Sequence, residues 1–342
     1  MLRAHCKNIA DQRGVLMTAL NPEQLATTIQ LKRLTASCIN AINRAMLALI
    51  VAAVGPMTAC GGSSAQGDVK QRVDIGGRTL YLECRGTGSP TVILEAGLRN
   101  RADVWSVLDS PTSTQTMVMP GVAAFTRVCA YDRPGTTLGV DDRSRSDPVP
   151  MPRTLRDTVA DLHALLIHAK IPGPYVLVGH STGGMIVRLY ATEYPQDIAG
   201  MVWVEALPDD MRAHMTPAQY TLFVRLNTEP PEPLANYAEL ETIGFDASFE
   251  QMREAAAATP LRRMPLVVLS RGVPTAEFPS DVPADFGPAF EQAWQAEQTR
   301  LVTLVPDARQ VIASKSGHYI MIEQPDLVID AIRNVVNAAR AL

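Results

Sequence analysis

The stretch that decides the fold runs from Tyr175 to Met185 and reads YVLVGHSTGGM. Its first four residues are apolar and rich in β-branched side chains, which is typical of a buried parallel strand. A glycine-containing turn with a serine follows, and the segment from Met185 onward has helical character. The sequence therefore predicts a strand, a tight turn and a helix, with the serine at the turn.

This turn fits the pattern G-x-S-x-G with Ser181 at its centre. In that pattern the serine adopts a strained backbone conformation, and Gly179 and Gly183 leave room where strand and helix cross. The serine Oγ is then presented above the sheet edge, and the N–H of Thr182 has no partner within the helix. We predict Ser181 as a nucleophile and Thr182 as an oxyanion donor. The alternative is a glycine-rich turn that merely contains a serine.

Composition and charge are those of a globular protein with an acidic body. The 342 residues are 46% hydrophobic and 19% charged. Of 31 basic and 35 acidic side chains, six basic and two acidic ones lie in residues 1–59, which leaves a net charge of −8 on residues 60–342. An acidic body argues against nucleic acid as a partner. No Walker loop or zinc-ligand spacing is present, so the sequence predicts neither a cofactor nor a metal.

The amino-terminal segment has the pattern of an export signal. An apolar run, residues 45–54, follows basic side chains and precedes small residues and Cys60. The sequence Met57-Thr58-Ala59-Cys60 resembles a bacterial lipoprotein signal, which implies cleavage before Cys60, diacylglycerol on its thiol, and a location in the cell envelope on the outer face of the cytoplasmic membrane. A secretory signal and a transmembrane anchor are the alternatives, although the run is short for a span. Residues 1–59 are expected to be removed or disordered, and residues 60–68 to form a flexible tether.

Residues 69–342 alternate between predicted strands and helices, which indicates a mostly parallel sheet with helices on both faces. The insertion at 207–263 is rich in Pro, Met and Ala, contains helical stretches without strands, and is predicted to be a lid over the strand ends. The predicted strands lie at 69–75, 78–84, 91–94, 128–131, 175–178, 201–204, 266–269 and 310–313. The predicted helices lie at 153–170, 185–194, 290–301 and 325–341, and a further helix is expected to begin at 104–108.

Four motifs in this order resemble the α/β-hydrolase superfamily. They are Leu94-Glu95-Ala96-Gly97, Ala130-Tyr131-Asp132-Arg133-Pro134-Gly135, Gly179-His180-Ser181-Thr182-Gly183-Gly184 and Ser316-Gly317-His318. The resemblance extends from about Val69 to the end of the chain. It is closest to the esterase, lipase and peptidase-like members that use serine, because the dehalogenase and epoxide-hydrolase members carry an aspartate at the turn. It implies an α/β-hydrolase fold and a Ser–acid–His triad.

The expected base is His318, which follows a strand in the tight sequence Lys315-Ser316-Gly317-His318, where a loop can aim its imidazole at Ser181. The superfamily usually places the acid after the strand at 266–269, but Ser270-Arg271-Gly272 follows there and the next acid is Glu277. Some members carry it after the preceding strand, where Glu205 stands. Glu205 is therefore our first choice and Glu277 the alternative, with Asp209 and Asp281 still open; a carboxylate that only binds loop amides would also explain Glu205.

Two further expectations follow from the resemblance. Gly97-Leu98 stands where the superfamily has its His-Gly turn, so the Leu98 N–H is expected to be the second oxyanion donor, and Glu95 is expected to be structural. Cys84 and Cys129 are expected on neighbouring strands, which an exported protein can join by a disulfide; two buried thiols are the alternative.

The sequence thus predicts a serine hydrolase that cleaves small-molecule carboxylic esters through an acyl-enzyme. A peptidase or an acyltransferase of the same fold would use the same residues. A catalytically silent ligand-binding lipoprotein is the alternative from another class, and it predicts an incomplete triad. The sequence leaves the oligomeric state and the acyl chain length open.

Overall fold

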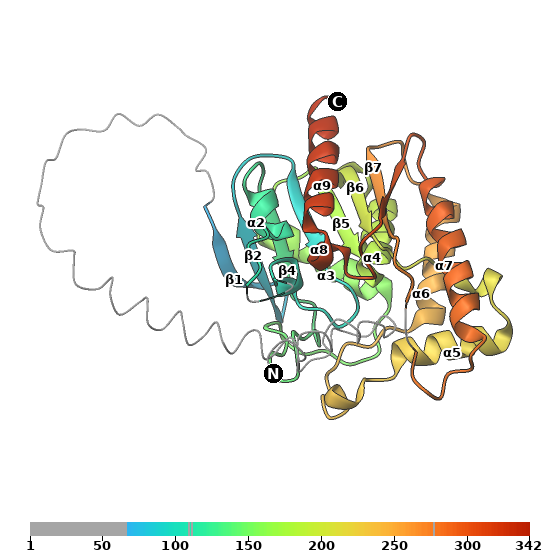
Figure 1. Ribbon diagram of the computed structural model, residues 1–342. Coiled ribbons are helices and arrows are strands. Elements are labelled where there is room, and N and C mark those ends of the chain that lie inside the picture. The colour runs from blue at the N-terminus through green and yellow to red at the C-terminus, as the bar shows by residue number, and fades with distance from the viewer. Residues whose placement is uncertain (1–66, 109, 111, 276–277) are drawn as a thin grey trace, which may run out of the picture.

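The computed structural model describes residues 67–342 apart from residues 109, 111, 276 and 277 (Figure 1). Cys60 and Glu277 therefore lie outside the described residues. None of the helices in the described part of the chain combines the length and apolar character needed to cross a membrane.

An eight-stranded sheet forms the centre of the structure. Its strand order is β1-β2-β4-β3-β5-β6-β7-β8. The pairings β1–β2 and β2–β4 are antiparallel, and every other pairing is parallel. The predicted mostly parallel sheet is confirmed. The strands are β1 (Val69–Asp74), β2 (Thr79–Arg85), β3 (Thr91–Glu95), β4 (Val128–Tyr131), β5 (Tyr175–His180), β6 (Ile198–Val204), β7 (Leu266–Arg271) and β8 (Arg309–Ala313).

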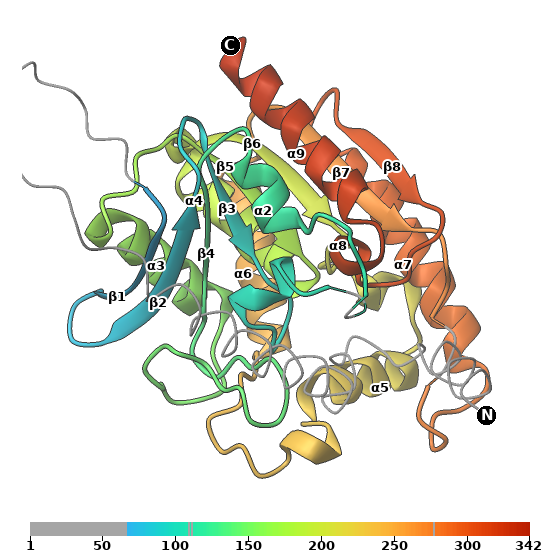
Figure 2. The same ribbon diagram turned by 60° about the vertical axis from the view of Figure 1, so that its left-hand side comes forward.

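Helices cover both faces of this sheet, because the side chains of the central strands alternate between two cores. On β5, Tyr175 and Leu177 belong to the core shared with α3 and α4, whereas Val176 and Val178 belong to the core shared with α2 and α9. Figure 2 shows α2 and α9 on the same face. The helices outside the insertion are η1 (Ala102–Trp105), α2 (Val118–Ala123), α3 (Leu155–His168), α4 (Thr182–Glu193), η2 (Pro195–Asp197), α7 (Phe286–Val302), α8 (Ile320–Glu323) and α9 (Pro325–Arg340).

The insertion between β6 and β7, residues 207–263, contains helices and no strand. Its elements are η3 (Met211–His214), α5 (Pro217–Thr228), η4 (Glu232–Leu234) and α6 (Phe245–Ala258). The guanidinium of Arg99, in the loop after β3, donates to the carbonyls of Thr228 (2.8 Å) and Glu229 (3.0 Å). The end of α5 is thus bound to a loop at the carboxyl edge of the sheet, and Figure 1 shows α5 beside this edge.

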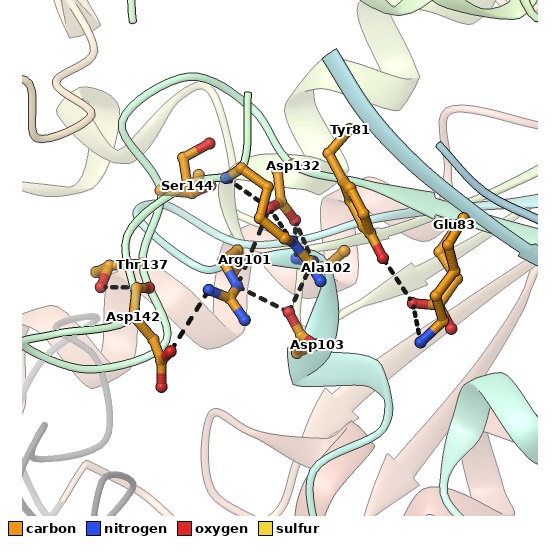
Figure 3. A network of polar contacts seen from close by, with 12 residues as sticks. Tyr81, Glu83, Arg101, Ala102, Asp103, Asp132, Thr137, Asp142 and Ser144 are labelled. Atoms are coloured by element: carbon orange, nitrogen blue, oxygen red, sulfur yellow. Dashed lines mark hydrogen bonds and ion pairs between the residues drawn. The ribbon is translucent and has the colours of Figure 1, made fainter. Parts of the chain in front are cut away.

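A buried carboxylate organises the loop after β4 (Figure 3). Asp132 is fully buried, and it accepts hydrogen bonds from the Ala102 N–H (3.1 Å) and from Arg145 Nε (2.7 Å). The Arg145 guanidinium lies 3.6 Å from the centre of the Tyr81 ring and also donates to Asp103 (2.8 Å). These contacts join the loop after β4, the start of η1 and strand β2, so the carboxyl edge is fixed on this side.

Cys84 of β2 and Cys129 of β4 face each other in the antiparallel register, with their Cα atoms 4.0 Å apart, and a disulfide joins them. Both residues are buried. The bond closes a loop of chain with a sequence separation of 45 residues, so it restricts the unfolded chain.

Replacing both cysteines by alanine is expected to lower the free energy of unfolding by about 2 to 4 kcal/mol, because the loop-closure restriction is lost. Urea denaturation followed by circular dichroism measures this change. Reducing the unsubstituted protein with dithiothreitol is the matched control and should produce a loss of similar size. Equal stability of the reduced and oxidised proteins would contradict the structural role of the bond.

Candidate active site

Ser181 lies at the turn between β5 and α4 with φ 52° and ψ −123°, in the left-handed region that non-glycine residues rarely adopt. Backbone hydrogen bonds hold this conformation. The Ser181 N–H donates to the Val204 carbonyl (3.2 Å), and the Ser181 carbonyl accepts from the N–H groups of Gly184 (2.9 Å) and Leu207 (2.8 Å). The turn is therefore fixed by the end of β6 and by the first turn of α4, which offsets its strain.

Two glycines make this turn sterically possible. A Cβ at Gly179 would collide with the backbone of Gly183, and a Cβ at Gly183 would lie 2.5 Å from the carbonyl oxygens of Glu95 and Ala96. The strand, the helix and the end of β3 thus approach each other more closely than a side chain would allow.

Glu205 follows β6, has φ 47° and is fully buried. Its Oε1 lies 3.9 Å from His318 Nδ1, which is within ion-pair range and longer than a hydrogen bond. Arg271 holds the carboxylate, since its backbone N–H donates to Oε2 (2.7 Å) and its Nη1 to Oε1 (2.5 Å). Burial alone would raise the pKa of Glu205, but Arg271 and His318 outweigh it and hold that pKa below its ordinary value.

His318 lies in the turn after β8, and α8 holds this turn in place. Glu323 of α8 accepts from the Gly317 N–H (2.7 Å), and the carbonyl of His318 accepts from His180 Nε2 (2.9 Å). The His318 side chain is 12% exposed, and its ring makes an edge contact with Trp294 at a centroid distance of 5.8 Å. Burial lowers the pKa of His318 below its ordinary value, and the Glu205 carboxylate opposes this only in part.

Of the carboxylates weighed as the acid, the structure brings Glu205 to the histidine. Asp209 instead forms ion pairs with Arg188 (2.6 Å) and Arg300. Asp281 is exposed and pairs with Arg225 at 2.9 Å. Glu277 is among the residues that are not described.

The two expected oxyanion donors belong to segments that adjoin Ser181. Thr182 is the first residue of α4 and is buried. The loop after β3 passes directly beside the serine, because a Cβ built on Gly97 would lie 3.2 Å from the Cβ of Ser181. Leu98 is the next residue of that loop and is also buried. The structure therefore places Thr182 directly after the serine and brings Gly97, the residue before Leu98, against it.

Three charged side chains around this site were not predicted as functional. Arg271 is the last residue of β7, at the position where the superfamily usually carries the acid. Arg133 lies in a motif that carried the resemblance, and Glu241 lies in the insertion, where no pattern marks it. In the described part of the chain, no group of three His, Cys, Asp or Glu side chains has the arrangement of a metal site.

Comparison with known proteins agrees with this architecture. The model of a family described as "Alpha/beta hydrolase family" matches residues 92–331. The chain is 28% identical to the uncharacterized protein YqjL of Bacillus subtilis over 256 residues, which cover 75% of this chain and 87% of that protein. It is 23% identical to an AB hydrolase superfamily protein of Gibberella zeae over 313 residues, which cover 76% of this chain and 92% of that protein.

Solved structures show the same fold at low sequence identity. A thermophilic esterase from Thermogutta terrifontis matches with a TM-score of 0.52 and 20% identity, over 80% of this chain and 99% of that chain. A bromoperoxidase from Bacillus anthracis matches with a TM-score of 0.53 and 17% identity, over 79% of this chain and 100% of that chain. The sheet order, the serine turn and the family match over residues 92–331 together show that this chain belongs to the alpha/beta hydrolase family.

Proposed function

We propose that this hydrolase cleaves carboxylic esters through an acyl-enzyme on Ser181. One observation carries the proposal: a serine in a strained turn shares the carboxyl edge of the sheet with a histidine whose Nδ1 lies 3.9 Å from a buried carboxylate. Such a pair can take a proton from the serine and stabilise the imidazolium that results. The 3.9 Å separation is compatible with this role, because catalytic hydrogen bonds often shorten when substrate binds.

In the proposed reaction, Ser181 Oγ forms a bond to the acyl carbon and its proton passes to His318. The carbonyl π electrons move onto oxygen, and the N–H groups of Thr182 and Leu98 stabilise this oxyanion. When the C–O bond to the alcohol breaks, His318 returns the proton to the leaving oxygen. A water molecule then attacks the acyl-enzyme in the same way, which releases the acid and restores Ser181. Glu205 keeps the imidazole oriented throughout.

Labelling with a fluorophosphonate probe tests the proposal. The purified full chain should form an adduct on Ser181, mapped by mass spectrometry, and it should hydrolyse p-nitrophenyl esters faster than the matching p-nitroanilides. Faster cleavage of the anilides would replace the esterase by a peptidase, and acyl transfer to added alcohol in preference to water would replace it by an acyltransferase. A folded protein without any adduct would favour a ligand-binding function instead.

The pH dependence of turnover is a separate prediction. The value of kcat/KM should rise with pH along a limb whose midpoint lies below 6.5, because His318 acts as a base only when neutral and burial lowers its pKa from that value. The pKa of Glu205 is also lowered, chiefly by the charge of Arg271, which favours the carboxylate form that the mechanism needs. A profile measured between about pH 4.5 and 8 with a p-nitrophenyl ester tests this. A flat profile, or a midpoint above the ordinary histidine value, would contradict the role of His318.

We also propose that the protein is exported and anchored to the membrane by a lipid on Cys60, on the strength of the sequence Met57-Thr58-Ala59-Cys60 after an apolar run. Growth with an alkyne-bearing fatty acid should label the protein in the membrane fraction, and Cys60→Ser should abolish the label. An unlabelled protein released to the medium would show a secretory signal, and an unlabelled membrane-bound one would show a transmembrane anchor.

A further inference from the structure

One buried guanidinium contacts three successive residues at the start of the loop that carries Leu98, residues 95–99, and the Gly97 carbonyl of this loop also accepts from the Asn100 N–H (3.0 Å). Arg133 Nη1 donates to the Glu95 carboxylate (2.5 Å) and to the Ala96 carbonyl (2.8 Å). Its Nη2 donates to the Gly97 carbonyl (2.7 Å). Because the guanidinium is planar and rigid, these bonds fix three successive residues of the loop relative to one another.

This arrangement also fixes the direction of the expected oxyanion donor. The Gly97 carbonyl and the Leu98 N–H belong to one peptide group, and in a planar trans peptide they point in opposite directions. Holding the Gly97 oxygen on Arg133 therefore orients the Leu98 N–H away from Arg133. A rotation of this peptide group would break the bond to the guanidinium.

Glu241 holds Arg133 in turn. Its Oε1 accepts from Arg133 Nε (2.5 Å) and its Oε2 from Arg133 Nη2 (2.9 Å), which is a bidentate pair. The same Oε2 accepts from the backbone N–H of Arg99 (2.6 Å). The peptide group before Leu98 is thus held by Glu241 through Arg133, and the peptide group after Leu98 is held by Glu241 directly.

Glu241 belongs to the insertion, and its own backbone is anchored to the body of the protein. The Glu241 N–H donates to the Gly135 carbonyl (2.9 Å), and the Arg153 N–H donates to the carbonyl of the next residue, Thr242 (2.9 Å). The Arg99 guanidinium donates to the Glu241 carbonyl (3.3 Å) as well as to the end of α5. This part of the insertion and residues 95–99 therefore form one connected unit.

The four charged side chains of this unit balance one another. Glu95, Arg99, Arg133 and Glu241 are all at least nine-tenths buried, and they comprise two cations and two anions. Removing the charge of Glu241 leaves two guanidinium groups with Glu95 as the remaining anion of the four. If Glu241 acted only through its charge, its loss would make the surroundings of the oxyanion more positive and would speed the reaction. If it acts by holding the loop, its loss will slow the reaction, so the sign of the change separates the two.

We propose that Glu241 is a positioning residue of the oxyanion hole: through Arg133 and the Arg99 N–H, the insertion fixes the peptide groups on both sides of Leu98. The proposal rests on the proposed esterase function. It makes this part of the insertion a fixed component of the catalytic machinery.

The test compares Glu241→Gln with Glu239→Gln, which makes the same chemical change on an exposed side chain of the same segment. In Glu241→Gln one of the two acceptor oxygens becomes an NH2 group that faces donors, and the negative charge is lost, so the bidentate pair with Arg133 cannot form. We expect kcat for a p-nitrophenyl ester to fall roughly 10- to 100-fold, somewhat less than the loss of a whole oxyanion donor, while KM stays within about twofold. Affinity for a trifluoromethyl ketone, whose adduct carries an oxyanion, should fall by a similar factor. Glu239→Gln should match the unsubstituted enzyme in all three measurements.

Several results would overturn the proposal. An unchanged or increased kcat in folded Glu241→Gln would do so, and so would an effect on KM alone. If that variant does not fold, Glu241→Asp decides, because its carboxylate is one methylene too short for the bidentate pair and full activity would exclude a positioning role. If the unsubstituted chain neither reacts with a fluorophosphonate nor turns over esters, the proposed function fails and this proposal fails with it. If the unsubstituted enzyme is labelled normally and the Glu241→Gln variant has the same kcat, this proposal alone is rejected and the proposed function stands.

Discussion

Replacement of Ser181 by alanine is expected to lower kcat for a p-nitrophenyl ester by about 10⁴- to 10⁶-fold and to abolish labelling by a fluorophosphonate. The substitution removes one oxygen atom, the proposed nucleophile, so no acyl-enzyme can form. The fold should survive, because the hydrogen bonds that hold the turn use the backbone N–H and carbonyl of residue 181, which alanine retains. Single-turnover kinetics measure the loss of catalysis, and thermal unfolding measures whether the fold is retained.

Ser280→Ala is the matched control, since Ser280 is exposed on the loop between β7 and α7. It should be indistinguishable from the unsubstituted protein. If Ser181→Ala retains more than about one hundredth of the activity and unfolds at the same temperature, the nucleophile is another residue.

Replacement of Glu205 by glutamine is expected to lower kcat by about 10³- to 10⁴-fold. The amide lacks the negative charge that stabilises the imidazolium. Its NH2 group would also face donors of Arg271, because in the unsubstituted enzyme the Arg271 N–H (2.7 Å) and Nη1 (2.5 Å) bind the Glu205 carboxylate. The pKa of His318 should fall further below its ordinary value in this variant, because the variant lacks the carboxylate that raises the pKa of His318 in the unsubstituted enzyme. The residual activity should therefore reach its plateau at lower pH than in the unsubstituted enzyme.

Glu277→Gln serves as the comparison, because Glu277 is the acid at the usual position in the sequence order. It should retain full activity. The reverse pattern, with loss of activity in Glu277→Gln and none in Glu205→Gln, would assign the acid to the loop after β7. Full activity of both variants would show that neither residue is the acid.

Local signals in the sequence were sufficient for much of the fold. The turn around Ser181 could be predicted because its strain and its close approaches require serine and glycine at fixed spacing. The sheet could be predicted because buried parallel strands are short apolar runs. Helix α2 was not predicted: it has six residues, Val118–Ala123, and contains a proline and a glycine, which are weak helix formers. It is stabilised by packing, since a Cβ at Gly121 would collide with Ile329 of α9.

The contacts that orient the site join residues far apart in the chain, so no local sequence pattern predicts them. The expected helix near Val104 is a short 3-10 segment, Ala102–Trp105, whose first N–H binds Asp132 across 30 residues of chain. Arg133 and Glu241 are 108 residues apart, and their pairing depends on where the insertion packs. A single sequence contains no periodicity that would reveal such a pair.

The buried ion pair of Arg133 with Glu241, and the bond from the Arg99 backbone N–H to the same carboxylate, have a consequence for recombination among members of the family. A chimaera that receives a foreign insertion without an acid at this position keeps the buried Arg133 guanidinium but loses one of its two carboxylate partners, and the Arg99 N–H loses its acceptor. A buried ion that loses its partner typically costs about 3 to 5 kcal/mol, which is a large share of the stability of a domain. When segments of the insertion are exchanged in this chain, residue 241 should therefore be kept with the body of the protein. The exchanged segment should end before residue 241.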